Sequence, residues 1–432
     1  MTLLHVGMIS FDWYPFEVRS LREAEAAASA GHRVDFICLR QPHEKKQEIY
    51  HEVHVYRLPI NRNYNGSLPL TIFQWCWFLL LAAIKIARLH MKDRYDIVHV
   101  HNMPDFLVFA ALFPKLLGAR VILDIQDVSP ELMGAKIQGK GLLSKIVIRL
   151  AIWQERISSA FAHHVVTTGE PFTKLLVKRG VPEKKISSIL NSADPQLFPV
   201  ERRCPLPYDS SSTPLESRPF NFMYHGLLTK RNGLDIAIRA LAIARRSVPQ
   251  LRLVIQGIGD QLPFLKELAV TLGISDSVIF TDAPVPPDKI VDFVVRGDAG
   301  IVPYRYDGFE EYVLPTKAYE YAWMHRPIIA SDTYAIRSMF RPESIYLCDP
   351  TRPESFAEAM IDLFQHPEKR ATMIASAAED YLPYRWELMA ETYQQLLRSL
   401  CRSQEKDEVH QPTDEVHQPT DEVHQPTAIS QV

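Results

Sequence analysis

Two hydrophobic patterns alternate along most of the chain. Short, mostly apolar runs, of the kind that buried parallel strands need, occur at residues 3–8, 33–39, 121–125 and 299–302. Between such runs, apolar residues recur at helical spacing, and glycine or proline stands at several of the boundaries. Strands that alternate with helices predict a doubly wound α/β architecture with parallel sheets.

A turn-rich stretch divides this pattern into two parts. Residues 201–219 contain four prolines and a run of three serines, which is typical of a linker. With 432 residues the chain is also too long for one ordinary domain. We therefore expect a first domain over residues 1–200, the linker over 201–219, and a second domain over 220–384.

The end of the chain follows a different pattern. Residues 385–402 carry apolar side chains at helical spacing and predict one last helix. The heptapeptide DEVHQPT then repeats three times from Asp407 to Thr427. One valine and one proline in every seven residues cannot form a coiled-coil seam, so we expect residues 403–432 to be a disordered tail.

Two segments of the first domain, one apolar and one amphipathic, are compatible with contact to a membrane. Residues 68–84 are nearly all apolar and include Trp75 and Trp77, so they predict either a helix buried between two layers or a peripheral membrane contact. Residues 136–156 interleave basic and apolar side chains. They would suit an anionic membrane or a lipid-pyrophosphate acceptor, and the alternative is a solvated helix face.

Composition narrows the class of protein. Hydrophobic residues make up 47% of the chain and charged residues 23%, as in a soluble globular protein. The net charge of −3 argues against a nucleic-acid partner. Five widely spaced cysteines and no signal-peptide pattern at the N-terminus favour a reducing cytoplasm. The cysteines and histidines show no ligand spacing, so we expect neither a metal nor a cofactor.

The candidate chemistry is concentrated between Asp298 and Asp332. An apolar strand leads through a loop to a helix expected to begin at Pro315, and a helix N-terminus offers free N–H groups to a phosphate. Lys317 in the first turn opposes the helix dipole unless it faces an anion, and Glu320 could accept two hydroxyls of a ribose. The simpler alternative is a surface ion pair between the two side chains.

A second possible phosphate site follows the strand expected over residues 220–225. Gly226 would let a ligand approach the backbone, and Lys230 and Arg231 come just before a helical pattern. We assign Arg231, and with it Lys230, to a diphosphate.

The segment Leu-Pro-Thr-Lys-Ala-Tyr-Glu-Tyr, residues 314–321, closely resembles the Pro-Ser/Thr-Lys-x-x-Glu-Tyr element of the family 4 glycosyltransferases. The resemblance runs from about residue 3 to 400. It implies a retaining enzyme of the GT-B fold, with two Rossmann-like domains facing a cleft and residues 385–402 crossing back onto the first domain. The nucleotide-sugar donor would bind the second domain and a glycan or lipid-linked acceptor the first.

The resemblance also suggests roles for individual residues. Thr316, Lys317 and Glu320 match the donor-binding element. Asp307 and Gly308 resemble the family's Glu-Gly-Phe, which makes Asp307 the first candidate for the acid that touches the sugar and Gly308 a substrate contact. Glu310 and Glu311 are held in reserve, because Tyr312 stands where the family's spacing places the first acid.

In the first domain, the resemblance points to two strand ends. We expect His99 and His101 to face opposite sides of one strand, so that only one lines the site, and we favour His101 at the carboxyl end. The alternative is that both histidines have hydrogen-bond partners within the protein and only support the site. Relatives often carry His-Asp where this chain has Gln126 and Asp127. Glutamine cannot take a proton at neutral pH, so Asp127 or the donor phosphate would do the acid/base work.

The predicted function is transfer of a hexose from a nucleotide diphosphate sugar to an acceptor hydroxyl, of the kind used in bacterial exopolysaccharide or lipopolysaccharide assembly. Leu227, Asn232, Gln126 and Tyr312 depart from common family residues. A nucleotide-sugar-binding or scaffold subunit without catalysis therefore stays open, as does an epimerase of the same fold acting on UDP-N-acetylglucosamine. We expect a cytoplasmic location, with peripheral contact to the inner face of the membrane as an option.

Overall fold

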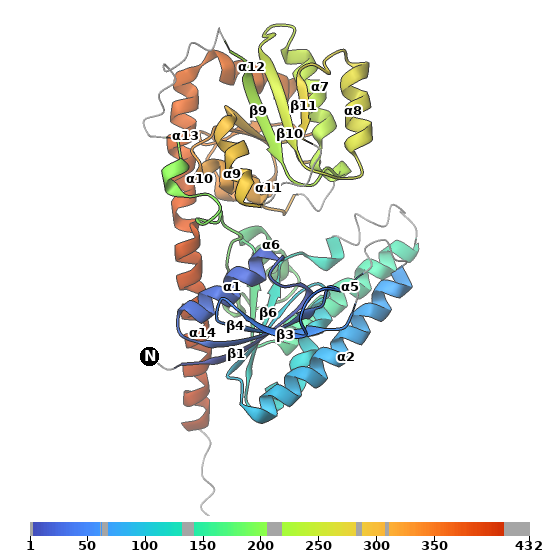
Figure 1. Cartoon of the computed structure of the whole chain (residues 1–432), viewed down its shortest axis with the longest axis vertical. Coiled ribbons are helices and arrows are strands. Elements are labelled where there is room, and N and C mark those ends of the chain that lie inside the picture. The colour runs from blue at the N-terminus through green and yellow to red at the C-terminus, as the bar shows by residue number, and fades with distance from the viewer. Residues whose placement is uncertain are drawn as a thin grey trace, which may run out of the picture.

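Figure 1 shows a computed structural model of the chain, in which two α/β domains are stacked along the long axis. The described residues are 3–60, 62, 68–131, 142–204, 218–281, 287–306 and 311–409. Asp307, Gly308, most of the predicted linker and all but the first three residues of the tail repeats lie outside them.

The first domain is built on an eight-stranded sheet of order β3-β4-β2-β1-β5-β6-β7-β8, parallel except for the β3–β4 pair. Its elements are β1 (His5–Trp13), α1 (Val18–Ser29), β2 (Arg33–Leu39), β3 (Gln47–Tyr50), β4 (Val53–Leu58), α2 (Leu68–Lys92), β5 (Ile97–His101), the 3-10 helix η1 (Asp105–Ala111), α3 (Leu112–Leu116), β6 (Arg120–Ile125), α5 (Leu142–Phe161), β7 (His164–Thr167), α6 (Glu170–Lys178) and β8 (Ile186–Ser188).

Alternate residues along the strands divide the core of this domain into two layers. Val6 and Met8 belong to one cluster with residues of α1 and α14 (Trp386–Val409), whereas Ile9, Val98 and Val100 belong to another with residues of α2, η1 and α6. A period of two is what a strand between two helical layers requires.

The second domain is built on a six-stranded parallel sheet of order β11-β10-β9-β12-β13-β14. Its elements are β9 (Phe220–His225), the 3-10 helix η5 (Lys230–Asn232), α7 (Leu234–Ala244), β10 (Leu251–Gln256), α8 (Leu262–Thr271), β11 (Val278–Thr281), α9 (Pro287–Arg296), β12 (Ala299–Val302), α10 (Thr316–Trp323), β13 (Ile328–Ser331), α11 (Tyr334–Met339), β14 (Tyr346–Cys348), α12 (Pro353–Gln365) and α13 (Pro367–Tyr381).

The last helix joins the two domains. Figure 1 shows α13 and α14 running down one side of the molecule from the second domain to the first. Tyr393 and Leu397 of α14 are fully buried, and Gln394 donates from Nε2 to the carbonyl of Ala26 at 3.1 Å. The final helix thus completes the α1 side of the first sheet. The residue limits predicted for the domains, linker and crossover helix stay predictions.

Helix α2 corrects one sequence interpretation. The buried helix between two layers is wrong, because only 17% of the most apolar window of this helix is buried. Within the described residues it is the one helix long and apolar enough to cross a membrane by length and composition. Phe78, Ala82 and Ile86 nevertheless anchor one side of it in the core of the first domain.

In both sheets the strand order reverses at one position, and a doubly wound fold usually binds its ligands at such a position. Strand order reverses beside β1 and β5 in the first sheet and beside β9 and β12 in the second. Crevices at the carboxyl ends of such strands are the usual binding positions. Of the candidate residues, His101 ends β5, Gly226 directly follows β9, and Lys317 lies in the helix that follows β12.

Candidate active site

Lys317 lies in the first turn of α10, just after Pro315, whose backbone is extended at the N-cap. The side chain is 7% exposed. Its Nζ donates to the Tyr304 hydroxyl at 3.1 Å and lies 4.9 Å from the centre of the Tyr224 ring. Among the described residues, no carboxylate forms an ion pair with it. Thr316, at the first helical position, is exposed.

The charge of Lys317 is retained despite its burial. Burial alone would lower the pKa of this ammonium, but Tyr224, Tyr304 and Glu320 outweigh it and raise the pKa above its ordinary value. A side chain built onto Gly226 would place its Cβ 3.7 Å from Nζ. A buried cation therefore faces bare backbone at a helix N-terminus, an arrangement that favours an anion.

Glu320 is paired with His225, so the simpler alternative of a surface ion pair between Lys317 and Glu320 is wrong. Oε2 of Glu320 accepts from Nε2 of His225 at 2.5 Å, and His225 Nδ1 lies 3.1 Å from the Tyr321 hydroxyl. Burial would raise the pKa of Glu320, but His225 and Lys317 hold it below its usual range. Oε1 has no partner among the described residues and can accept from a ligand hydroxyl.

Lys230 and Arg231 belong to η5, and both side chains are exposed. Their carbonyls accept hydrogen bonds from Arg305, Nε to Lys230 at 3.1 Å and N to Arg231 at 3.0 Å. The charge of Arg231 acts on the pKa of Tyr224, as that of Lys317 does. Both cations therefore act on the pKa of the same tyrosine, and their shared diphosphate stays a prediction.

Asn232 departs from common family residues for a local structural reason. Its side chain and Thr229 form a capping box that closes η5, with 2.5 Å between the Thr229 hydroxyl and Asn232 Oδ1. The turn then passes Gly233 at φ 64°, where a Cβ would lie 1.8 Å from the carbonyl oxygen of Pro303. Asn232 therefore shapes the loop that carries the two cations.

The Gly-x-Gly after β10 supports the Gly226 loop. A Cβ on Gly257 would lie 1.9 Å from the carbonyl oxygen of Gly226, so the two backbones are in direct contact. Gly226 itself has φ 124°, a left-handed conformation that favours glycine. The glycines let the loops at the ends of β9 and β10 pack on each other.

In the first domain, a pocket of about 200 Å³ lies at the carboxyl ends of β1, β5 and β6. Asp127 lines it and is exposed, and Gln126 lines it and is half-buried. Its other lining residues are Ser10, Phe11, Asp12, Glu17, Arg62, Asn102 and Met103. Glu17 also caps α1 by accepting from the backbone N–H groups of Arg19 and Ser20.

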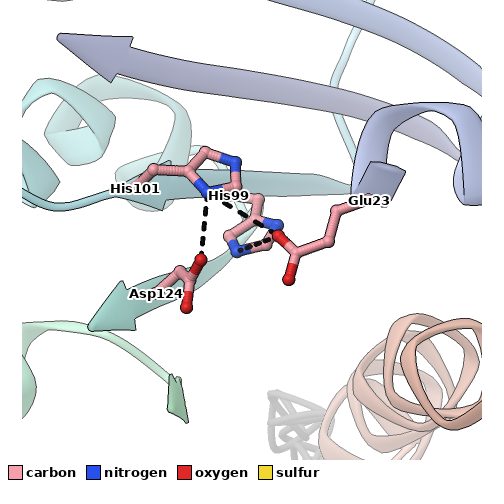
Figure 2. Close-up of side chains that lie close together, drawn as sticks. All are labelled: Glu23, His99, His101 and Asp124. Atoms are coloured by element: carbon pink, nitrogen blue, oxygen red, sulfur yellow. Dashed lines mark hydrogen bonds and ion pairs between the residues drawn. The ribbon is translucent and has the colours of Figure 1, made fainter. Parts of the chain in front are cut away.

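His99 and His101 occupy the same face of β5, and the expectation that they face opposite sides is wrong. Residues two apart in a strand point the same way. Their ring centres lie 4.4 Å apart and both side chains are fully buried. Figure 2 shows them with Glu23 and Asp124: Nδ1 of His101 is 3.1 Å from Asp124 and 3.6 Å from Glu23.

Arg19 completes this buried cluster. Its guanidinium donates to both oxygens of Asp124 at 2.8 and 2.9 Å and lies 3.2 Å from Glu23. Burial raises the pKa of Glu23 to about 8, although Arg19 opposes the rise. Burial would also raise the pKa of Asp124, but Arg19 and His101 lower it instead. The cluster thus holds one firmly ionised and one readily protonated carboxyl.

Glu23, His99, His101 and Asp124 could hold a metal ion by distance, since their ligand atoms lie within 4.8 Å of one another. However, the guanidinium of Arg19 already pairs with the ionised Asp124, and Glu23 is readily protonated. His101 also lies beneath the pocket rather than on its wall, with Gln126 Nε2 3.4 Å from its Nδ1. Sequence reasoning missed Arg19 and Glu23 as partners, because residue names give no sign that α1 turns them toward β5 and β6.

Of the candidates for the acid that touches the sugar, the structure describes Glu311 alone. Asp307, Gly308 and Glu310 lie outside the described residues. Glu311, held in reserve, accepts from the backbone N–H of Tyr334 at 3.1 Å and so caps α11.

Two α/β domains with largely parallel sheets, a helix that crosses back onto the first domain, and a buried lysine at the N-terminus of α10 are the features of a glycosyltransferase of the GT-B fold. The family models agree: "Glycosyl transferase 4-like domain" matches residues 16–191 and "Glycosyl transferases group 1" matches residues 209–380. The chain belongs to this glycosyltransferase family, and it is an enzyme of that class.

Particular relatives give the range of similarity. The chain is 30% identical over 175 residues to a D-inositol 3-phosphate glycosyltransferase of Acidothermus cellulolyticus, a match that spans 38% of each chain. Sucrose-phosphate synthase from Thermosynechococcus elongatus superimposes with a TM-score of 0.72 at 16% identity, over 93% of this chain and all of that one. The structure of Anabaena HepE in complex with UDP and glucose superimposes with a TM-score of 0.66 at 15% identity, over 92% of this chain and 100% of that one.

Proposed function

We propose that the chain transfers a hexose, with retention of anomeric configuration, from a nucleotide diphosphate sugar to a hydroxyl of a glycan or lipid-linked acceptor. The observation that carries the proposal is the buried ammonium of Lys317, which has no carboxylate partner among the described residues and lies beside Gly226. A diphosphate at the N-terminus of α10 would supply the missing negative charge.

The proposed donor site uses three groups from the second domain. Lys317 and Arg231 neutralise the leaving diphosphate as the bond to the sugar breaks, which stabilises charge that develops in the transition state. Glu320, held by His225 through Oε2, accepts donor hydroxyls at Oε1. The sugar then carries oxocarbenium character, and the acceptor oxygen attacks the face from which the diphosphate leaves.

The proposed acceptor site is the pocket at the ends of β1, β5 and β6. Asp127 is exposed there and can receive the proton of the attacking hydroxyl, with the donor phosphate as the alternative base. The catalytic role predicted for His101 is indirect in this proposal, since the ring lies under Gln126. Peripheral contact with the inner face of the membrane would bring a lipid-linked acceptor to this pocket.

A donor panel tests the proposal without an identified acceptor. UDP-, GDP- and ADP-sugars are incubated with the full chain, and proton NMR follows which anomer of the free sugar appears first. Early release of the α-anomer from an α-linked donor supports retention, and early β-anomer overturns it. Lys317→Ala and Glu320→Ala should each abolish turnover with thermal unfolding nearly unchanged; absence of both nucleotide binding and turnover in the unmodified chain would refute the proposed donor site.

A further inference from the structure

Helix α5 has its apolar side chains on the outside. Five large apolar residues follow one another at intervals of three or four, each between 36% and 74% exposed: Leu142, Ile146, Leu150, Trp153 and Ile157. The fully buried side chains of the helix are small or polar: Ser144, Ala151, Glu155, Ser158 and Ser159. Val147 and Ile148 on the same side are only half-buried. A surface helix of a soluble domain normally shows the reverse.

Helix α2 extends the apolar surface. Phe73, Trp77 and Leu80 are exposed on the side away from its buried anchor residues. Trp75 packs edge-on against Phe106 of η1 at 6.4 Å, so of the two tryptophans only Trp77 points outward. Both α2 and α5 pack against η1 and run along the same edge of the first domain (Figure 1).

The exposed charges of the two helices are all positive. Residues 68–92 contain no aspartate or glutamate. The only acid of α5 is Glu155, which is buried and accepts from Arg179 Nη1 at 2.7 Å. Lys145, Arg149 and Arg156 are exposed on α5 beside the apolar stripe. Apolar and basic groups without exposed acids match the interface of an anionic bilayer.

We propose that the exposed sides of α2 and α5 form a docking surface for an anionic lipid bilayer, with both helices lying in the interfacial plane. Helix α2 does not cross the bilayer, because Phe78, Ala82 and Ile86 are part of the core of the first domain. Helix α2 also contacts the acceptor pocket, through its buried side: Phe11, which lines that pocket, packs against Phe78 at 5.2 Å. Docking through the opposite, exposed side of α2 would therefore bring the pocket close to the bilayer.

Vesicle sedimentation of the full chain tests this inference independently of transfer. Binding is measured with vesicles of equal parts phosphatidylcholine and phosphatidylglycerol, and with pure phosphatidylcholine. We expect the double variant Leu150→Ser/Trp153→Ser to reduce binding to the anionic vesicles about tenfold or more, because two large side chains no longer enter the interface. The matched control is Phe264→Ser/Val270→Ser on α8 of the second domain, whose side chains are also exposed.

The outcomes separate the possible occupants of the surface. Binding that needs phosphatidylglycerol, falls in the α5 variant and persists in the α8 variant supports the docking surface. No vesicle binding, or equal binding by both variants, overturns it. Light scattering that shows a dimer dissociating in the α5 variant, without vesicle binding, also overturns it and assigns the surface to a second copy. Each of these results leaves the donor test of the proposed function unaffected.

Discussion

Replacing Lys317 with methionine separates a donor-binding role from a structural one. The ammonium is buried, donates to Tyr304 and has no carboxylate partner among the described residues. Methionine fills a similar volume without charge. If a phosphate oxygen lies about 4 Å from Nζ at an effective dielectric of about 20, the pair contributes roughly 4 kcal/mol. Removal of one charge-stabilising donor lowers kcat by about 100- to 1000-fold in comparable sites.

The effect on stability should be small in the same variant. The fold loses one hydrogen bond to Tyr304, worth about 1 kcal/mol, and is relieved of a desolvated charge. These contributions oppose each other, so we expect Tm to change by no more than about 4 °C. A structural lysine would instead show a loss of stability that accompanies the loss of activity.

The assay combines titration calorimetry of UDP, GDP and ADP with donor turnover and thermal unfolding. Lys266→Met on α8 is the control, since Lys266 is an exposed lysine of the same domain. Unchanged nucleotide affinity and turnover in Lys317→Met would refute the reasoning. A Tm drop of more than about 8 °C in that variant would do the same, because it would assign the residue to the fold.

Three further predictions concern the paired side chains. Glu320→Gln keeps a partner for His225 but removes a charged acceptor, so KM for the donor should rise about tenfold in initial-rate assays; an unchanged KM contradicts the proposed donor contact. Glu23 has a pKa raised from 4.5 to about 8, so its stabilising contribution is complete below pH 4.5 and is lost as pH rises through 8. Glu23→Gln should therefore raise Tm more at pH 9 than at pH 6, and equal shifts would be evidence against a buried acid. Tyr393→Phe leaves buried Nδ1 of His99 without its 2.9 Å partner, so chemical denaturation should show a loss of about 1–3 kcal/mol, and no loss would mean that the bond does not stabilise α14.

The architecture could be predicted because its signals are local. Mostly apolar runs such as residues 121–125 predict buried parallel strands, and this run is a strand in the structure. The helix at Lys317 was equally clear, because proline and apolar spacing mark its start and its buried side. Its neighbours Tyr224 and Tyr304 could not be inferred, since they come from the ends of two other elements, β9 and β12, whose packing beside α10 the residue names do not show.

Side-chain pairing across elements set the limit of prediction in both domains. Spacing alone would allow an ion pair between Glu320 and Lys317. In the structure, Oε2 of Glu320 instead lies 2.5 Å from Nε2 of His225, at the end of the strand beside α10. Likewise, hydrophobicity cannot tell an inward from an outward helix: α2 carries apolar residues on both sides, and only its packing on η1 shows which side is exposed. The roles of Asp127 and Asp307 stay predictions.

The position of α14 has a consequence for synthesis on the ribosome. The first sheet is complete in sequence by Ser188, but Tyr393 and Leu397, which cover its α1 side, are translated some two hundred residues later. Until then His99 faces an open surface, and the nascent first domain exposes apolar groups that attract chaperones. A protein truncated before Trp386 would lack α14, which covers the α1 side of the first sheet, although the truncation is at the other end of the chain from that domain.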